Sequence, residues 1–252
     1  MRLKNKVAVI TGGNSGIGFG IAQEFVAEGA VGAIAGRTQK TLDSSVAALN
    51  DQFIGIKCDV TKLDDLSSMF AEAEQKFGKL DILIVNAGGA IGAGTAGNMA
   101  DVTEDDFDKI MDLNLKSVFF TVQKALPHLK DGASVVMVGS LAAHKPLDGL
   151  TTYGGAKAAV VNWARSFSKD LANRKIRVNI LSPGTIDTPA FEKFGIPHDI
   201  AMELKHQVGS ANLVQRIGLP SEMGKVAVFL GSDDSSFVIG QEIVADGGVY
   251  HF

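Results

Sequence analysis

Short apolar runs alternate along the chain with longer segments in which apolar residues recur at helical spacing. The runs are rich in β-branched residues and predict strands, at Lys6–Thr11, Val31–Gly36, Phe53–Lys57, Asp81–Val85, Ser134–Val138, Ile176–Leu181 and Glu242–Val244. Each interval between two runs is long enough for a crossover helix, so parallel pairing is the simplest topology. We therefore predict an α/β fold, a doubly wound parallel sheet of about seven strands with helices on both faces.

Two central strands indicate that both faces of the sheet are covered. Ile82–Val85 and Val135–Val138 are continuous in apolar residues, as strands between two helical layers are. An eight-fold α/β barrel is the alternative architecture, but the chain offers one strand too few for it.

Two helix starts carry the spacing of a capping box, in which a hydroxyl side chain is followed three residues later by an acidic one. Thr103 and Asp106 predict the start of a helix that runs to about Leu126. Thr61 and Asp64 repeat the signature before an earlier helix.

Composition and length fit one domain, residues 1–252. The chain is 46% hydrophobic and 21% charged, which excludes disordered, collagen-like and disulfide-stapled proteins. No linker or repeat divides it, and its least regular stretches are Gly88–Gly97 and Pro189–Gly218. We expect residues 189–218 to form a substrate lid, with a helix packed on the core or on a neighbouring subunit as the alternative.

Charge, cysteine content and apolar runs indicate the kind of partner and the cellular location. The net charge of −4 argues against a broad basic surface for nucleic acid and favours a small-molecule partner. The single cysteine, Cys58, forms no intrachain disulfide and fits a reducing compartment. The apolar run Val7–Ile10 is too short for a signal peptide, and no run reaches the roughly 18 apolar residues of a membrane span. We expect a cytoplasmic protein that has no membrane contact.

A glycine-rich turn follows the first strand and opens a helix. Gly12, Gly16 and Gly18 permit a tight turn and a close approach of backbone amides to a pyrophosphate. A glycine-rich connection that binds nothing is the alternative. The stricter Gly-x-Gly-x-x-Gly spacing occurs at Gly92–Gly97, but this stretch does not join a strand to a helix, so we treat it as coincidental.

Tyr153 and Lys157 lie four residues apart on a predicted helix, so their side chains leave the same face. A phenol acts best as a general acid or base when its pKa is lowered towards neutral pH, and a nearby ammonium supplies enough energy for that shift. An amphipathic helix with a buried Tyr and a snorkelling Lys would show the same spacing. The small residues between them and Ser140 upstream favour the catalytic interpretation.

Five patterns in this order resemble the short-chain dehydrogenase/reductase family of classical type. They are the turn Thr11–Gly18, Asn86–Gly88 after the fourth strand, Asn114 in the next helix, the set Ser140, Tyr153 and Lys157, and Pro183, Gly184 and Thr188 after the sixth strand. Together they span nearly the whole chain.

The resemblance implies a single Rossmann-type domain and a role for each matched residue. Tyr153 would donate a proton to a carbonyl oxygen that Ser140 holds. Lys157 would lower the pKa of Tyr153 and contact the nicotinamide ribose, and Asn114 would support a proton-relay water chain. The implied cofactor residues are Gly12, Asn14, Ser15, Gly16, Ile17, Gly18, Arg37, Thr38, Asp59, Val60, Asn86, Ala87, Gly88, Tyr153, Lys157, Pro183, Gly184, Ile186 and Thr188. The expected substrate residues are Ser140, Ala142, His144, Tyr153, Phe191 and Phe194.

The end of the second strand bears on the choice of cofactor. An NAD-type site places a carboxylate there for the ribose hydroxyls, whereas this chain has Gly36 followed by Arg37. By the resemblance, Arg37 would pair with a 2′-phosphate, which favours NADPH. A solvated Arg37, or one that stacks on adenine, would also allow NADH.

The expected reaction is hydride transfer between a nicotinamide cofactor and a ketone or secondary alcohol. A 3-oxoacyl thioester reductase, a sugar dehydrogenase and a non-catalytic dinucleotide-binding scaffold are the alternatives. The five histidines lack metal-site spacing, so we predict no catalytic metal. Ser140 lacks the elbow motif of a hydrolase. The tail Asp246–Phe252 resembles the family's subunit contact and implies a homotetramer.

Overall fold

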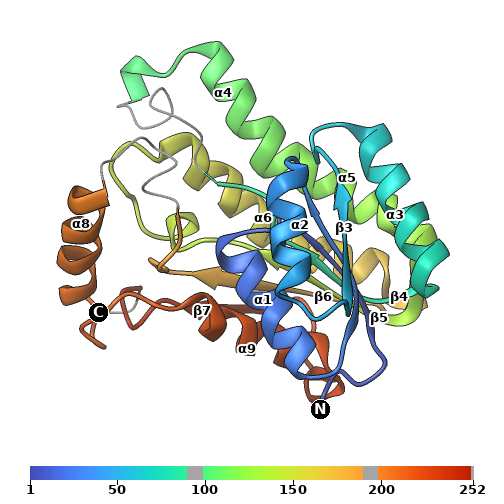
Figure 1. The fold of residues 1–252 in the computed structure, drawn as a ribbon. Coiled ribbons are helices and arrows are strands. Elements are labelled where there is room, and N and C mark those ends of the chain that lie inside the picture. The colour runs from blue at the N-terminus through green and yellow to red at the C-terminus, as the bar shows by residue number, and fades with distance from the viewer. Residues whose placement is uncertain (90–98, 190–197, 251–252) are drawn as a thin grey trace.

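The strands of the protein form one open parallel sheet (Figure 1). The computed structural model describes residues 1–89, 99–189 and 198–250. The strands are β1 (Val7–Thr11), β2 (Val31–Gly36), β3 (Phe53–Lys57), β4 (Leu80–Val85), β5 (Leu129–Val138), β6 (Arg177–Pro183) and β7 (Glu242–Ala245), in the order β3-β2-β1-β4-β5-β6-β7. Every neighbouring pair is parallel. The doubly wound prediction is confirmed, and the barrel alternative is wrong because the sheet ends at β3 and β7.

Helices cover both faces of this sheet (Figure 1). The α-helices of the described residues are α1 (Gly16–Ala27), α2 (Gln39–Ala47), α3 (Leu63–Phe77), α4 (Glu104–Met111), α5 (Ser117–Ala125), α6 (Thr151–Asp170), α8 (His198–Ser210) and α9 (Pro220–Gly231). Buried residues of α1, α2 and α9 pack on one face, and those of α3, α5 and α6 pack on the other. The strand order reverses between β1 and β4, and in such sheets a ligand binds at that crevice.

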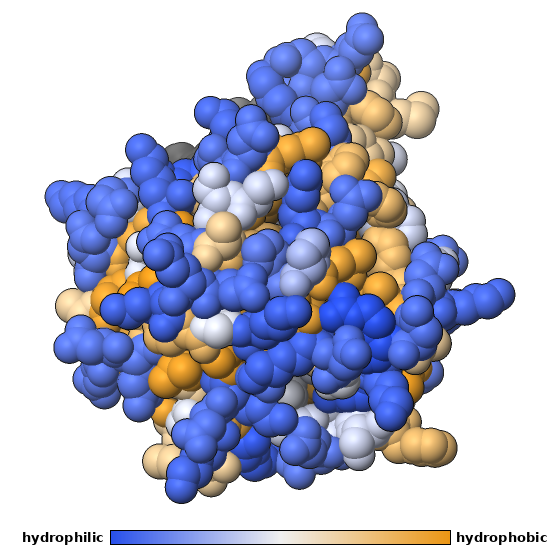
Figure 2. All heavy atoms as spheres, turned by 90° about the vertical axis from the view of Figure 1, so that its right-hand side faces the viewer, coloured by the Kyte–Doolittle hydropathy of each residue, from blue (hydrophilic) through white to orange (hydrophobic). Residues whose placement is uncertain are grey.

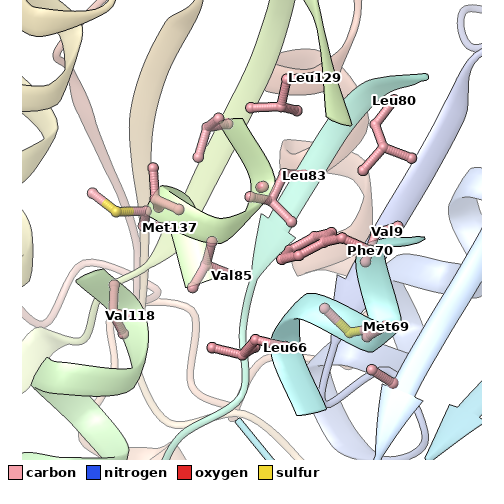
Figure 3. Close-up of a cluster of buried hydrophobic side chains, with 14 of the residues drawn as sticks. Val9, Leu66, Met69, Phe70, Leu80, Leu83, Val85, Val118, Leu129 and Met137 are labelled. Atoms are coloured by element: carbon pink, nitrogen blue, oxygen red, sulfur yellow. The ribbon is translucent and has the colours of Figure 1, made fainter. Parts of the chain in front are cut away.

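The alternation of side chains along each strand builds the two cores. In β1, Val9 joins the core under α3 and α5, whereas its neighbours Ala8 and Ile10 join the core under α1 and α9. Figure 3 shows Phe70 of α3 facing Leu83 of β4 in the first of these cores. Because both faces are buried there, the central strands β4 and β5 carry the continuous apolar runs Ile82–Val85 and Val135–Val138, as the sequence analysis predicted.

One of the two predicted hydroxyl side chains caps its helix. Thr103 accepts a hydrogen bond from the backbone N–H of Asp106 and caps α4. The prediction at Thr61 is wrong, because α3 begins two residues later and the Thr61 hydroxyl donates instead to Asp59.

The single helix predicted from Thr103 to about Leu126 is divided. Five residues, Asp112–Lys116, form a π-helical turn between α4 and α5. Within this turn Asn114 donates a hydrogen bond to the carbonyl oxygen of Ile110. Such single π turns mark functional positions in many helices.

One face of the molecule is mostly polar (Figure 2). On the face shown in Figure 2, hydrophilic residues predominate and hydrophobic ones appear in small patches between them. Among the helices of the described residues, none is long and apolar enough to cross a membrane.

Candidate active site

A cavity of about 840 Å³ opens at the carboxyl ends of the strands, where the strand order reverses. Its volume lies in the range of ligand pockets. The predicted residues that line it are Gly12, Asn14, Ser15, Gly16, Ile17, Arg37, Asp59, Val60, Asn86, Ala87, Gly88, Ser140, Tyr153, Lys157, Pro183, Gly184 and Thr188. The cavity thus brings together residues from every predicted motif, with Asn114 itself as the exception.

The turn after β1 leaves no room for larger side chains. Gly12 and Gly16 have φ values of 65° and 54°, which favour glycine. A Cβ atom on Gly18 would lie 2.3 Å from the carbonyl oxygen of Gly12. The turn therefore holds the start of α1 close to β1, so that the backbone N–H groups of the first helical turn are available to an anion. This cradle fits the pyrophosphate of a dinucleotide.

Asn86 joins the ends of β1 and β4 beneath the cavity. Its side-chain amide donates to the carbonyl oxygens of Thr11 (3.0 Å) and Gly12 (3.2 Å). The buried Thr11 hydroxyl accepts from the backbone N–H groups of Asn86 and Ala87. Asn86 is therefore placed to shape the phosphate turn as well as to line the cavity.

At the end of β2, the space beside Gly36 is taken by the side chain of Asn14. A Cβ atom on Gly36 would lie 2.6 Å from Oδ1 of Asn14, whose amide donates to Thr41. Arg37 is exposed at the cavity edge, across from Asp59. Burial disfavours the charged form of Asp59, but hydrogen bonds from Thr61 and the charge of Arg37 outweigh it and lower the pKa of that carboxyl.

Lys157 reaches the floor of the cavity from α6. Its ammonium donates to the carbonyl oxygen of Val138 (2.8 Å) and lies 5.7 Å from the centre of the Tyr153 ring. A Cβ atom on Gly88 would lie 3.5 Å from Nζ, so the glycine leaves the ammonium accessible from the cavity. Burial lowers the pKa of Lys157 to about 8.

The pKa of Tyr153 differs from the sequence expectation. We expected Lys157 to lower the pKa of Tyr153, but burial raises it, and a hydrogen bond with Ser140 offsets only part of that rise. The reason is geometric, because the Lys157 ammonium donates its hydrogen bond to Val138 and lies over the Tyr153 ring, 5.7 Å from its centre. When only the groups of the protein act on it, Tyr153 is therefore a protonated phenol at neutral pH.

Ser140 begins a short turn between β5 and α6. It caps the 3₁₀ helix Leu141–Ala143 by accepting a hydrogen bond from the N–H of Ala142 (3.1 Å). A Cβ atom on Gly154 would lie 2.7 Å from the Ala142 carbonyl oxygen, so this turn packs directly on the first turn of α6. Ser140 and Tyr153 are thereby held on adjacent walls of the cavity.

Asn114 lies just behind the cavity wall and is fully buried. Its amide donates to the carbonyl oxygen of Gly89 (3.0 Å), and its Oδ1 accepts from the Gly89 N–H (2.8 Å). The π turn thus directs Asn114 at the loop after β4.

Replacing Asn114 with Ala should lower the free energy of unfolding by about 1–3 kcal/mol, because buried backbone groups of Gly89 and Ile110 lose their partner. Denaturant unfolding measures this change. The exposed Asn162 on α6 provides the matched control, and an equal loss in Asn162→Ala would contradict the assignment.

Some predicted residues lie away from the cavity lining. Among the described lining residues, Gly18, Thr38, Ile186, Asn114, Ala142 and His144 do not appear. Ile186 instead pairs with Gly218, and His144 pairs with Glu242. Phe191, Phe194 and the glycines of the coincidental motif lie outside the described residues.

Sequence reasoning missed several residues of the cavity. Leu113 and Leu150 line it, as does Cys58, which we had assigned to the core only. Leu113 precedes Asn114 and Leu150 precedes Tyr153 by three residues, so their proximity to matched motifs was the available signal. A hydrophobic residue alone does not distinguish a cavity wall from a core.

Comparisons with known proteins agree with this geometry. Residues 12–250 match the family model described as enoyl-(acyl carrier protein) reductase. Dehydrogenase/reductase SDR family member 4 of Oryctolagus cuniculus is 36% identical, over 98% of this chain and 94% of that protein. The chain belongs to the short-chain dehydrogenase/reductase family. Oxidoreductase asL5 of Sarocladium schorii is a further relative of this family member, 39% identical over 98% of this chain and 97% of that protein.

Solved structures show the same likeness. A short-chain dehydrogenase/reductase of Caenorhabditis elegans, determined with cofactor, superposes with a TM-score of 0.92 at 32% identity, over 98% of this chain and 96% of that one. A short chain dehydrogenase of Burkholderia cenocepacia in complex with NADP gives 0.87 at 30% identity, over 98% and 99%. This short-chain dehydrogenase/reductase is accordingly a nicotinamide-dependent oxidoreductase that acts on small molecules. Within the described residues, no group of three or more His, Cys, Asp or Glu could hold a metal ion.

Proposed function

We propose that the protein reduces ketones, with Tyr153 as the general acid and NADPH as the preferred hydride donor. The observation that carries this proposal is the convergence of Tyr153, Ser140 and Lys157 on the cavity that the phosphate turn also lines. A scaffold that only bound a dinucleotide would need the phosphate turn. It would not need a phenol, a hydroxyl and an ammonium in the same cavity.

The chemistry follows from the protonation states of these groups. A bound nicotinamide supplies the hydride. Tyr153, whose pKa is raised by burial, carries a proton that it can donate to the carbonyl oxygen of the substrate. Ser140 donates a hydrogen bond to that oxygen, and Lys157 supplies a positive charge beside the phenolate that forms. With a pKa of about 8, Lys157 is mostly charged at neutral pH.

Asn114 has a supporting role in this proposal. Its side chain holds Gly89, and a Cβ atom on the neighbouring Gly88 would lie 2.9 Å from Asn114 Oδ1 and close to the Lys157 ammonium. Asn114 therefore orders the loop that borders Lys157. A proton-relay water chain would reach solvent from this loop.

The preference for NADPH rests on the end of β2. Asn14 fills the space beside Gly36 that an NAD-type carboxylate would need, and Arg37 at the cavity edge carries the charge that pairs with a 2′-phosphate. The neighbouring structure from Burkholderia cenocepacia holds NADP, which supports the same choice.

Replacing Arg37 with Ala should lower kcat/KM with NADPH by about 10- to 100-fold and leave kcat/KM with NADH nearly unchanged, because a charge-assisted hydrogen bond contributes about 1.5–3 kcal/mol. Steady-state kinetics with both cofactors measure this difference. Lys169→Ala, which removes one exposed positive charge on α6, is the matched control. An equal loss with NADPH and NADH would show that Arg37 does not recognise the phosphate.

Oxidation of NADPH and NADH should be followed with simple ketones, 3-oxoacyl thioesters, oxidised sugars and steroid ketones. The panel should also include a hydroxynaphthalene-type ketone, because a relative from Metarhizium majus, 34% identical over 98% of this chain, is a hydroxynaphthalene reductase-like protein. Turnover of a ketone supports the proposal and identifies the substrate class. Tight cofactor binding without turnover of any substrate would favour the non-catalytic scaffold.

We also propose that the protein is a cytoplasmic homotetramer. The family resemblance of the C-terminal tail supports this assembly, and Leu213, Val214 and the fully exposed Phe237 offer apolar surface for subunit contacts. Light scattering after size-exclusion chromatography tests the assembly against the chain mass of 26.4 kDa. Cell fractionation tests the location.

A further inference from the structure

A carboxylate on the last strand of the sheet joins two segments behind the active site. Oε1 of Glu242, on β7, accepts hydrogen bonds from the Ser182 hydroxyl and from Nε2 of His144 (2.7 Å). Ser182 is fully buried on β6, and Glu242 and His144 are both largely buried as side chains. No substrate or cofactor role in the proposed mechanism accounts for this group.

The partners of Glu242 lie at the two ends of the turn that carries Ser140. At the first end, Gly139 donates its N–H to β6, and a Cβ atom on Gly139 would lie 2.3 Å from the Ser182 hydroxyl. At the other end, His144 follows the 3₁₀ helix that Ser140 caps. One carboxylate oxygen therefore bonds directly to His144 at one end of the six-residue segment 139–144 and, at the other end, fixes the Ser182 hydroxyl against which Gly139 packs.

Few long-range hydrogen bonds fix the far end of the turn. Its backbone hydrogen bonds are short-range, from Ala143 to Ser140 and from His144 and Lys145 to Leu141, and Nζ of Lys145 donates to the carbonyl oxygen of Val249 (3.3 Å). The Tyr250 ring packs against the His144 ring, with centroids 4.9 Å apart, and helps to orient the imidazole towards Glu242. The opposite side of the turn rests on Gly154 of α6, one residue from Tyr153.

We propose that Glu242 is a positioning residue, which through Ser182 and His144 fixes Ser140 relative to Tyr153. Because the turn is wedged between β7 and the first turn of α6, a loss of the Glu242 contacts would let Ser140 move with respect to the phenol. Groups that hold a catalytic side chain in this way determine whether its geometry is productive. This inference rests on the proposed function of Ser140 and Tyr153.

The kinetic test compares Glu242→Leu, Glu242→Gln and the control Glu72→Leu, which changes an exposed residue of α3. We expect Glu242→Leu to lower kcat by about 10- to 100-fold, since a misplacement of about 1 Å can cost 10²-fold. The Kd for NADPH should stay within about twofold, because Glu242 does not line the cavity. Glu242→Gln keeps an acceptor oxygen and should recover most of the activity.

A double-mutant cycle with Ser140→Ala separates positioning from general destabilisation. If Glu242 acts through Ser140, Glu242→Leu has no further effect on kcat once the Ser140 hydroxyl is gone. Additive losses of kcat in the double variant would overturn the inference while leaving the proposed function intact. A weakened NADPH affinity equal to the loss in kcat would overturn it as well.

Hydrogen exchange of the full chain gives a readout that does not need turnover. Backbone amides of residues 141–145 should exchange faster in Glu242→Leu than in the parent protein, with the Ala142 N–H that donates to Ser140 among them. Ser182→Ala, which removes one of the two contacts, serves if Glu242→Leu does not fold. Unchanged exchange in these residues overturns the inference. If the parent protein turns over no carbonyl compound, the proposed function fails and this measurement alone decides the inference.

Discussion

Tyr153→Phe should lower kcat/KM for ketone reduction by about 10²- to 10⁴-fold, the contribution of a general acid. The substitution removes the phenol oxygen and its proton but retains the ring over which the Lys157 ammonium lies. The burial of the site and the hydrogen bond from Lys157 to Val138 should therefore persist. Steady-state kinetics with the substrate identified from the carbonyl panel measure the loss.

Cofactor affinity provides the control for Tyr153→Phe. The Kd for NADPH, measured by fluorescence titration, should change by no more than about threefold, because a neutral hydrogen bond contributes about 1 kcal/mol or less. The free energy of unfolding should fall by a similarly small amount, from the lost bond with Ser140. Turnover at the parent rate would show that Tyr153 is not the general acid and would contradict the proposed mechanism.

Lys157→Met should reduce both turnover and cofactor affinity, in contrast to Tyr153→Phe. The ammonium is the positive group beside Tyr153, and Lys157 lines the cavity in which a ribose hydroxyl would bind. A hydrogen bond from a charged donor contributes about 1.5–3 kcal/mol, so the Kd for NADPH should rise by about 10- to 100-fold. Fluorescence titration measures the Kd, and kinetics at saturating cofactor measure the remaining loss in kcat. A lowered kcat with an unchanged Kd would limit Lys157 to the proton transfer.

The same variant tests the effect of burial on Lys157 through stability. The folded protein lowers the pKa of this group from 10.5 to about 8, so between these values the unfolded chain binds more protons than the folded one. The free energy of unfolding of the cofactor-free parent should therefore rise with pH across this window, relative to that of Lys157→Met. Denaturant unfolding at several pH values measures the difference. Lys169→Met, at an exposed position on the same helix, should follow the parent.

The sheet was predictable because its strands are buried on both faces. The run Ile82–Val85 of β4 is apolar on both faces, so its assignment as a buried strand is clear, and the number of residues before the next strand requires a crossover connection. Helix details were less predictable. Thr103 and Thr61 have the same spacing to an acidic residue, yet only Thr103 caps a helix, because the Thr61 hydroxyl finds the nearer carboxylate of Asp59. Competition between local acceptors is not visible in the spacing.

The site was predictable where a residue's role follows from its place at the end of a strand. Ser140, Asn86 and two glycines of the phosphate turn, Gly12 and Gly16, are of this kind, and all line the cavity. The direction in which Lys157 points could not be predicted, because it depends on the carbonyl oxygen of Val138 on a neighbouring element. Glu242 was missed for the same reason, since 98 residues separate it from His144 in the chain.

The π turn at Asp112–Lys116 places a constraint on how this protein can change. Removing one residue that follows Asn114, Leu115 or Lys116, would let α4 and α5 merge into a regular helix, which is the more favourable local conformation. The merger would rotate Asn114 by about 100° relative to α5 and separate its amide from Gly89. Insertions and deletions in this stretch should therefore disrupt the contact between Asn114 and Gly89, even though the helix itself would tolerate them.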